Sequence, residues 1–486
     1  MSLSPQKKNN PNSKKKSEKN LKTRIDLQNS LPFPIDSLSI PSTLPSSNSS
    51  VKKSSRFSEE SSLSKLDFSS LQNANKYAPY SPYQASTRTA LSTRSSQIGT
   101  DSSQIESLPD EIIYKILSYV PRKEVLTSAA MVNQNFNFFA KSDELWRSVT
   151  LKHVTLPTRV WRQMARARPF ALEFSHVNFC KITPTQMKDL FSSSRRTLRI
   201  VKFKECTNID LSQIVLFLII KNCENIRELT LLSKTGQDFS HPSDYKLLAQ
   251  SVTNLKKLRL NDDNIKDSSV VELLASNQHC LQVVQLNRMF KLKAKALLKE
   301  LESIAKLKKL NLNLCYQMTD LSPVLVKNAS HMTSLKLENI QLNTSSLNAI
   351  FQLKNLKVLN LAYNRNVTER YLLEMSPSLP LLEKLNLNNC PVTNRALDSL
   401  TGLNRLVNLE LASTEITHLG FKFLLEFNRL EYLDISSNSI QDTVRHVSHL
   451  LSRLIRLRTI GLYGYEQLVV ETAKSYHVNV KEKSLS

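Results

Sequence analysis

Residues 356–364 read LKVLNLAYN, with leucine at the first, fourth and sixth places of the stretch and asparagine at the ninth. The same spacing returns as LKKLNLNLC at 307–315, LEKLNLNNC at 382–390 and LEYLDISSN at 430–438. Weaker copies extend the series from Leu198 to Leu457, eleven in all and on average about 26 residues apart. So many copies in one register indicate a repeat that governs most of the chain.

This template and period are the signature of leucine-rich repeats. Alternating leucines put every second side chain into a core, which predicts one short strand per copy. Segments between the copies, such as residues 294–304 and 421–427, have one apolar face and predict helices. The expected fold is an α/β leucine-rich-repeat solenoid, a horseshoe with strands on the concave side and helices on the convex side.

The ninth place of the repeat is asparagine or cysteine. We expect this side chain to turn inward and bond backbone groups where the strand ends, which makes Cys206, Cys315 and Cys390 structural. The six cysteines form no CxxC pair, so neither a zinc site nor a disulfide framework is expected.

Composition excludes several function classes. Glycine occurs only 6 times in 486 residues, and none of these positions forms a phosphate-binding loop. No apolar run is long enough to cross a bilayer, and the first residues lack the apolar segment of a secretion signal. We expect a cytoplasmic or nuclear protein with no membrane partner, no cofactor and no metal.

Residues 1–103 are serine-rich and basic, and we expect a disordered tail. Its lysine clusters at 7–8 and 14–16 fit either a nuclear import signal or a solvated tail. The other expected segments are a helical domain, a linker with a degenerate first repeat, the leucine-rich repeats and a C-terminal tail, at residues 105–152, 153–197, 198–470 and 471–486.

The helical domain opens with a capping pattern at Ser107 and Asp110, and apolar residues then recur at helical spacing from Ile113 to Val120. Three short helices in about 45 residues are too few to bury a self-sufficient core. We therefore expect one of their faces to dock on something else.

Residues 108–147 resemble an F-box. The resemblance is carried by LPDE at 108–111, ILSYVP at 116–121, Leu126, Ala129, Val132, FA at 139–140 and LWR at 145–147. An F-box followed by leucine-rich repeats is typical of the F-box/leucine-rich-repeat family. Phe136 stands where that family usually has tryptophan, which leaves affinity for the adaptor open.

The resemblance implies a non-catalytic substrate receptor of an SCF-type cullin–RING ubiquitin ligase. The positions that match the family's adaptor-facing residues are Leu108, Pro109, Ile113, Ile116, Leu117, Leu126 and Val132. Two alternatives remain open at this point: these residues only cap the first repeat, or the chain is a leucine-rich-repeat scaffold that never joins a ligase.

Residues between the repeat leucines should face the concave side, where they run from basic through amide-rich to acidic. The candidate target-binding residues are Lys202, Lys257, Arg259, Lys309, Asn311, Lys336, Asn360, Asn386, Glu410 and Asp434. The basic section suits an acidic or phosphorylated segment of a target protein. The alternative is a solvated surface that maintains solubility. We do not expect nucleic acid as a partner, because the basic section of this face lacks interleaved aromatic residues and its basic and acidic ends oppose each other.

Overall fold

A computed structural model describes residues 108–233, 244–261, 267–289 and 293–481. The chain divides into two units, residues 1–96 and 97–486, and every described residue belongs to the second. The predicted disordered tail and its lysine clusters lie outside the described residues.

Within the described residues, fourteen parallel strands form one sheet in chain order. They are β1 (Ser148–Lys152), β2 (Ala171–Ser175), β3 (Ile200–Lys204), β4 (Glu228–Leu232), β5 (Lys257–Leu260), β6 (Val283–Leu286), β7 (Lys309–Asn311), β8 (Ser334–Lys336), β9 (Val358–Asn360), β10 (Lys384–Asn386), β11 (Asn408–Glu410), β12 (Tyr432–Asp434), β13 (Thr459–Gly461) and β14 (Asn479–Lys481). Each strand pairs with the strand of the next repeat, so the predicted leucine-rich-repeat solenoid is confirmed.

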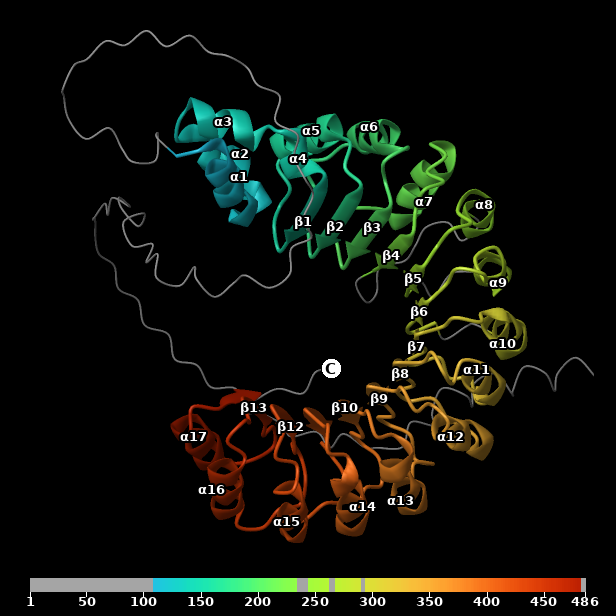
Figure 1. Ribbon diagram of the computed structural model, residues 1–486, viewed down its shortest axis with the longest axis vertical. Helices are drawn as coiled ribbons and strands as arrows, with labels where there is room; N and C mark the ends of the chain where they lie inside the picture. The colour runs from blue at the N-terminus through green and yellow to red at the C-terminus, as the bar shows by residue number, and fades with distance from the viewer. Residues whose placement is uncertain (1–107, 234–243, 262–266, 290–292, 482–486) are drawn as a thin grey trace, which may run out of the picture. The chain divides into compact units, whose positions relative to one another are not determined.

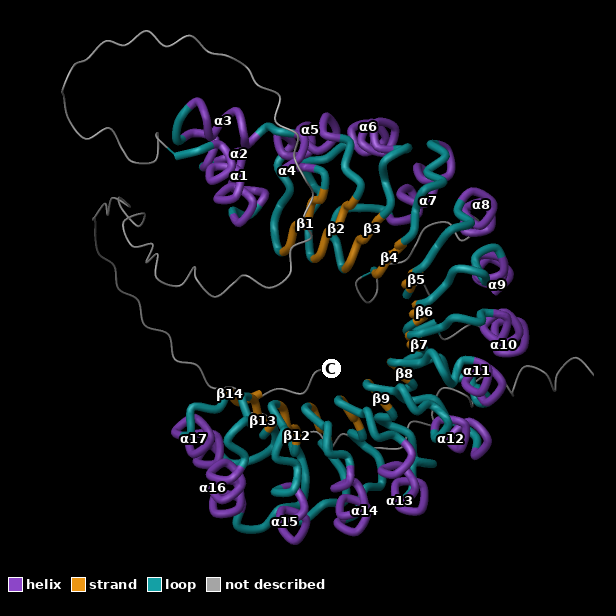
Figure 2. The backbone as a smooth tube through the Cα atoms, viewed as in Figure 1, coloured by secondary structure: helices purple, strands orange, loops and turns teal. Residues whose placement is uncertain are grey.

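Helices connect the strands on the opposite side of the arc (Figure 1, Figure 2). From the first repeats onward they are α5 (Thr158–Ala167), α6 (Pro184–Ser194), α7 (Leu211–Ile220), α8 (Asp244–Ser251), α9 (Asp267–Ala275), α10 (Ala294–Ser303), α11 (Ser322–Lys327), α12 (Thr344–Ile350), α13 (Glu369–Ser378), α14 (Asn394–Ser399), α15 (Phe421–Leu424), α16 (Thr443–Arg453) and α17 (Gln467–Ser475). Short 3-10 turns, η3 (Leu400–Gly402) and η4 (His418–Gly420), precede β11 and α15. Helices need more room than strands, so a stack of such repeats curves with its strands inside.

The repeat leucines form the core between the two layers. In the copy that starts at Leu356, the side chains of Leu356, Leu359 and Leu361 are almost completely buried. Strands β1 to β13 likewise bury apolar side chains, and one continuous apolar core extends from Ile113 to Val478.

The ninth place of the repeat bonds the backbone as predicted. Asn364 Nδ2 donates to the carbonyls of Leu337 and Leu361, and the thiols of Cys315 and Cys390 donate to Leu286 O and Leu361 O. Burial raises the pKa of the Cys390 thiol to about 12, so this cysteine stays a neutral donor at physiological pH. The structural role predicted for these cysteines is confirmed.

The sheet begins earlier and ends later than the predicted repeats. Strand β1 alternates buried and exposed residues without the leucine spacing of the template, so the periodicity at 26 residues did not reveal it, whereas β2 lies in the predicted degenerate first repeat. At the other end, residues 479–481 pair with the open edge of β13. The predicted C-terminal tail therefore contains the end of the last helix, at residues 471–475, and the last strand of the solenoid, at residues 479–481.

Candidate functional site

The N-terminal helices form a small bundle against the first strand. They are α1 (Asp110–Tyr119), α2 (Arg122–Thr127), α3 (Gln134–Ala140) and α4 (Asp143–Trp146), with a 3-10 turn, η2 (Ala129–Met131), before α3. Trp146 is fully buried, and its Nε1 donates to Ala140 O at 2.7 Å. This bond ties the end of the bundle to α3.

The bundle is packed onto the solenoid through α5. Helices α2 and α4 contact α5, and α2 also contacts β1. The buried side chain of Gln163 on α5 donates from Nε2 to Lys141 O in the bundle at 2.7 Å. The solenoid supplies the core that these short helices lack, which holds the bundle at a fixed place on the first repeat.

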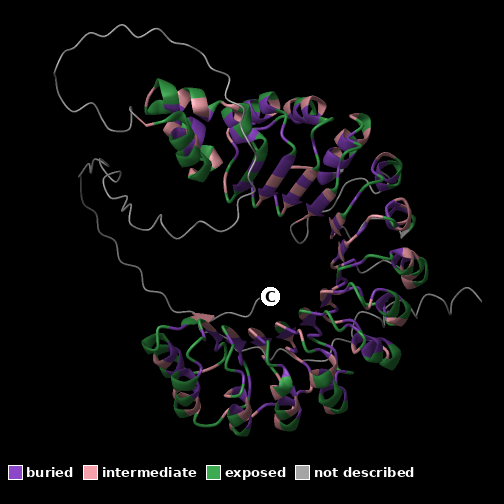
Figure 3. Ribbon diagram, viewed as in Figure 1, coloured by how far each residue is buried: buried purple, intermediate pink, exposed green. Residues whose placement is uncertain are grey.

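The bundle keeps several large apolar side chains exposed, and parts of its helices are coloured as exposed in Figure 3. On α1, Ile112, Ile116 and Tyr119 recur at helical spacing, and their exposed fractions are 42%, 38% and 70%. We call these three residues the docking stripe. Met131 and Val132 after η2 and Phe138 on α3 are also large exposed apolar side chains of this bundle. An exposed apolar stripe of this kind marks a protein-interaction surface.

Eight of the ten predicted concave-face residues lie in one continuous row, and Lys257 and Lys309 lie in the neighbouring row, two residues earlier on their strands. Pairing of successive strands joins Lys202 to Thr230, Thr230 to Arg259, and so on to Asp434. The full row reads Thr150, Glu173, Lys202, Thr230, Arg259, Gln285, Asn311, Lys336, Asn360, Asn386, Glu410, Asp434, Gly461 and Lys481. We call this row and the strand residues beside it the inner face.

Two of the predicted cations of the inner face are already neutralised. Lys202 Nζ lies 2.7 Å from Glu173 Oε1 and 3.2 Å from Glu228 Oε2, and Lys257 also pairs with Glu228. Burial opposes the charge on Glu228, but these two lysines outweigh it and lower the pKa of its carboxyl. Lys202 and Lys257 belong to the predicted basic section, but their ion pairs leave neither as a free cation for a ligand.

Arg259 and Lys309 form no ion pair with any described residue, and Arg259 Nε is buried without a hydrogen-bond partner there. They lie on β5 and β7, separated by two strand spacings and by two residues of register, which corresponds to about 12 Å. Lys336 on β8 lies near enough to help lower the pKa of Glu410, although burial dominates and raises it. The positive charge that remains for a ligand lies at β5 to β8.

Amide side chains hold the carboxylates of the next section. Asn313 and Asn360 both donate to Glu338 Oε2, at 2.8 and 3.1 Å. Asn386 and Asn388 both donate to Glu410 Oε2, at 3.0 and 3.3 Å. The predicted amide-rich section thus fixes the orientation of acidic side chains on the inner face.

The acidic end of the inner face is closed by the last strand. Lys481 Nζ reaches Asp434 Oδ2 at 2.9 Å across Gly461, where a Cβ would lie 2.2 Å from Asp434 Oδ1. Asp434 is only 2% exposed; burial opposes its charge, but hydrogen bonds from Ser436 and Lys481 outweigh burial and lower its pKa. Asp434 was predicted as a target-binding residue, but its burial and pairing assign it to the closure of the solenoid.

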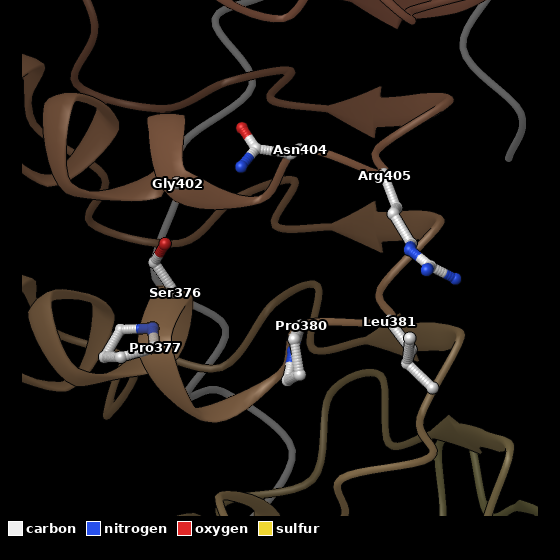
Figure 4. A pocket seen from close by; sticks show the side chains of 7 residues that line it. All are labelled: Ser376, Pro377, Pro380, Leu381, Gly402, Asn404 and Arg405. Atoms are coloured by element: carbon white, nitrogen blue, oxygen red, sulfur yellow. The ribbon is translucent and has the colours of Figure 1, made fainter.

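Two further features of the described part carry no assignment. A hollow between α13 and the turns before β10 and β11 is lined by Ser376, Pro377, Pro380, Leu381, Gly402, Asn404 and Arg405 (Figure 4). Arg405 is the one charged residue among them, and they include no acid–base pair. No described helix combines the length and apolarity of a membrane span, and no three described His, Cys, Asp or Glu residues are placed to hold a metal ion.

Residues 105–152 match the family model described as F-box-like. The chain thus contains an F-box-like domain followed by leucine-rich repeats. The F-box comprises the bundle α1–α4 and the first strand β1, and the repeats continue from there.

Two other comparisons are distant. The chain is 22% identical over 381 residues to the Caenorhabditis elegans protein named "Putative RNA-binding protein EEED8.10". The aligned region covers 71% of this chain and 48% of the relative. It thus spans about half the length of that relative. An internalin structure from Listeria monocytogenes is 14% identical, with 72% of this chain and 98% of the internalin covered and a TM-score of 0.39.

The predicted adaptor-facing residues of the F-box divide into two groups. Ile113, Leu117 and Leu126 are buried, because the apolar face of α1 and the end of α2 make the core of the bundle. These three cannot contact a partner directly, and this part of the prediction is corrected. The other four, Leu108, Pro109, Ile116 and Val132, are partly or fully exposed.

Sequence reasoning missed Ile112, Tyr119, Met131 and Phe138. Ile112 and Tyr119 share the helical spacing of Ile116, and this spacing was the available signal. Phe136, which replaces the usual tryptophan, is buried in the F-box core, and its N–H bonds the Asn133 cap of α3. The substitution therefore lies inside the domain and away from the docking stripe.

Proposed function

We propose that this F-box protein is the substrate-recognition subunit of an SCF-type cullin–RING ubiquitin ligase. The observation that carries the proposal is the F-box itself, held on the first repeat by α5 with its docking stripe exposed. In this role the docking stripe binds the SCF adaptor subunit, and the inner face binds the target protein.

Such a receptor acts by position and needs no catalytic group of its own. Because the F-box and the repeats share one continuous core, a target on the inner face is held at a set place relative to the adaptor. Holding two partners together raises the effective concentration of the target's lysines near the ubiquitin-loaded enzyme.

The double substitution Ile112→Asp and Ile116→Asp is expected to abolish adaptor binding. Two carboxylates would enter an apolar interface without partners, which should weaken binding at least about a hundredfold. Both side chains are exposed, so the fold should be unaffected. The measurement is the amount of adaptor and cullin that co-purifies with the tagged full chain, alongside its thermal unfolding.

A matched control is Leu419→Asp with Ile455→Asp, which replaces two exposed apolar side chains far along the repeats. This control should retain the adaptor. Equal adaptor recovery with the docking-stripe variant would contradict the proposal. Adaptor-free wild-type protein that still binds a target would support the alternative of a scaffold outside any ligase.

For the target, we propose an acidic or phosphorylated segment that contacts Arg259 and Lys309. Charge-assisted hydrogen bonds to these residues favour a carboxylate or phosphate. Lys336 adds positive charge beside them, while Lys202 and Lys257 act mainly as partners of Glu173 and Glu228.

Arg259→Glu combined with Lys309→Glu is expected to reduce target capture about tenfold or more, because two charged contacts become repulsive. The control reverses Lys295 and Lys299, two exposed lysines on α10 of the same part of the arc. Proximity labelling under proteasome inhibition, quantified by mass spectrometry, measures target capture. An unchanged set of labelled targets would mean that this section is only a solvated surface.

A further inference from the structure

The residues just before successive strands form a second row, at the edge of the sheet where the strands begin. The N–H of each donates to the carbonyl of its counterpart one repeat earlier, for example Arg227 to Arg199 and Lys256 to Arg227, both at 2.8 Å. Over the first seven strands the row reads Arg147, Phe170, Arg199, Arg227, Lys256, Gln282 and Lys308. We call it the edge row.

Five of these seven residues are cations. All five are exposed, and none forms an ion pair or a side-chain hydrogen bond with another described residue. Within the five residues before each of β1 to β7, Arg166, Arg168, Arg195, Arg196 and Lys306 add further positive charge, and the carboxylates are Asp143, Glu144 and Glu224. Cations therefore clearly outnumber carboxylates along the first half of this edge, which carries a net positive charge.

Further along the arc, the cations of this row form ion pairs with carboxylates of the same row. Lys357 Nζ lies 2.7 Å from Glu383 Oε1, and Arg458 Nε lies 3.8 Å from Glu431 Oε2, each pair within the row. The repeats can thus compensate cations at this position. The unpaired cations before β1 to β7 are therefore a local property of that part of the solenoid. A general need for solubility does not explain why they occur there and not along the whole row.

An exposed aromatic ring interrupts the cations. Phe170 is 41% exposed and lies in the row between Arg147 and Arg199. Six strand spacings of about 4.8 Å separate the ends of the row, a length of about 29 Å. A line of cations with an exposed aromatic residue is the surface that binds single-stranded nucleic acid, because the cations meet phosphates and a base stacks on the ring.

We propose that the edge row before β1 to β7 binds a single strand of nucleic acid, with its phosphodiester backbone along the cations and a base on Phe170. This site is separate from the docking stripe and the inner face, and it does not depend on ligase assembly. An acidic protein is the competing ligand. It would contact the cations, but its binding would not require an exposed aromatic ring between two arginines.

The test is fluorescence anisotropy of the full chain with labelled 12-mers of single-stranded uridine RNA and thymidine DNA, with a 12-base-pair duplex beside them. Five phosphate contacts predict a slope of about −3.5 for log affinity against log salt. Arg199→Gln, Arg227→Gln and Lys256→Gln together should reduce that slope to about −1.4 and weaken binding about a hundredfold at 50 mM salt.

The matched control is Lys357→Gln, Arg405→Gln and Arg458→Gln, three exposed cations of the C-terminal repeats. It keeps the same net charge as the edge variant and should bind like the wild type. Phe170→Ala should lower the binding affinity about fivefold or more, because it removes the ring on which a base stacks. The RNA and DNA arms identify which strand is preferred.

Equal losses in the edge and control variants would overturn the site, because binding would then follow net charge alone. Unchanged binding in Phe170→Ala, or equal displacement of the probe by polyglutamate, would overturn nucleic acid as the ligand and favour an acidic protein. Duplex bound as tightly as single strand would also contradict the proposed stacking.

Discussion

Replacing Trp161 with alanine is expected to lower the free energy of unfolding of the first repeats by about 3–5 kcal/mol, the range for large aromatic residues in a core. The Trp161 side chain on α5 is fully buried, with its ring centroid 6.4 Å from that of Phe174 and 6.1 Å from that of Phe179. Its Nε1 donates to Gln186 O on α6 at 3.0 Å. Alanine would leave a cavity and an unbonded carbonyl.

This substitution also tests whether the packing of α5 holds the F-box on the first repeats. Because α5 carries the contacts to α2 and α4, its loosening should expose the F-box and the first strands before the distant repeats unfold. Hydrogen exchange is the measurement, with faster exchange expected in α5 and β1–β3 and little change beyond β8. Trp161→Phe is the control. It also loses the Nε1–H, but it keeps an aromatic ring in the core, so it should lower the free energy of unfolding far less. Uniform acceleration along the whole chain would show that the repeats unfold as one unit.

Asn328→Leu is expected to destabilise the middle of the arc by about 2–4 kcal/mol, because it leaves buried backbone groups without partners. Asn328 is fully buried at the end of α11. Its Oδ1 accepts from Leu307 N at 2.9 Å, and its Nδ2 donates to Ile304 O at 3.0 Å and Val324 O at 3.1 Å. Leucine has similar size but can make none of these bonds.

The matched control is Asn355→Leu, an exposed asparagine whose Nδ2 donates once, to Ser330 O at 2.9 Å. Water can replace that bond, so a change of less than about 1 kcal/mol is expected. Chemical denaturation followed by circular dichroism measures both variants. Similar stability of Asn328→Leu and Asn355→Leu would show that the backbone near Leu307 finds other partners when Asn328 is absent.

Asn328 also illustrates the limits of sequence reasoning. The ninth-place residues Asn364 and Cys390 could be assigned because they belong to the repeated template. Asn328 and the equally buried Asn277 lie outside that template, and they bond the chain at sequence separations of about 21 to 25 residues. No local pattern marks such a residue as structural.

The sequence alone determined the strands of the repeats, their common core and the row of residues on the inner face. It could do so because side chains alternate with a period of two in every strand and a fixed repeat keeps each strand in register with the next.

Only the tertiary structure decided which charges and apolar residues are free to bind. Lys202 is neutralised by residues about 30 positions away, Asp434 is closed off by Lys481, and Ile113 is buried while Ile112 beside it is exposed. The same structure collected single cations from separate repeats into the edge row. Ion pairing and burial depend on neighbours in the adjoining repeats, and the composition of one repeat does not contain that information.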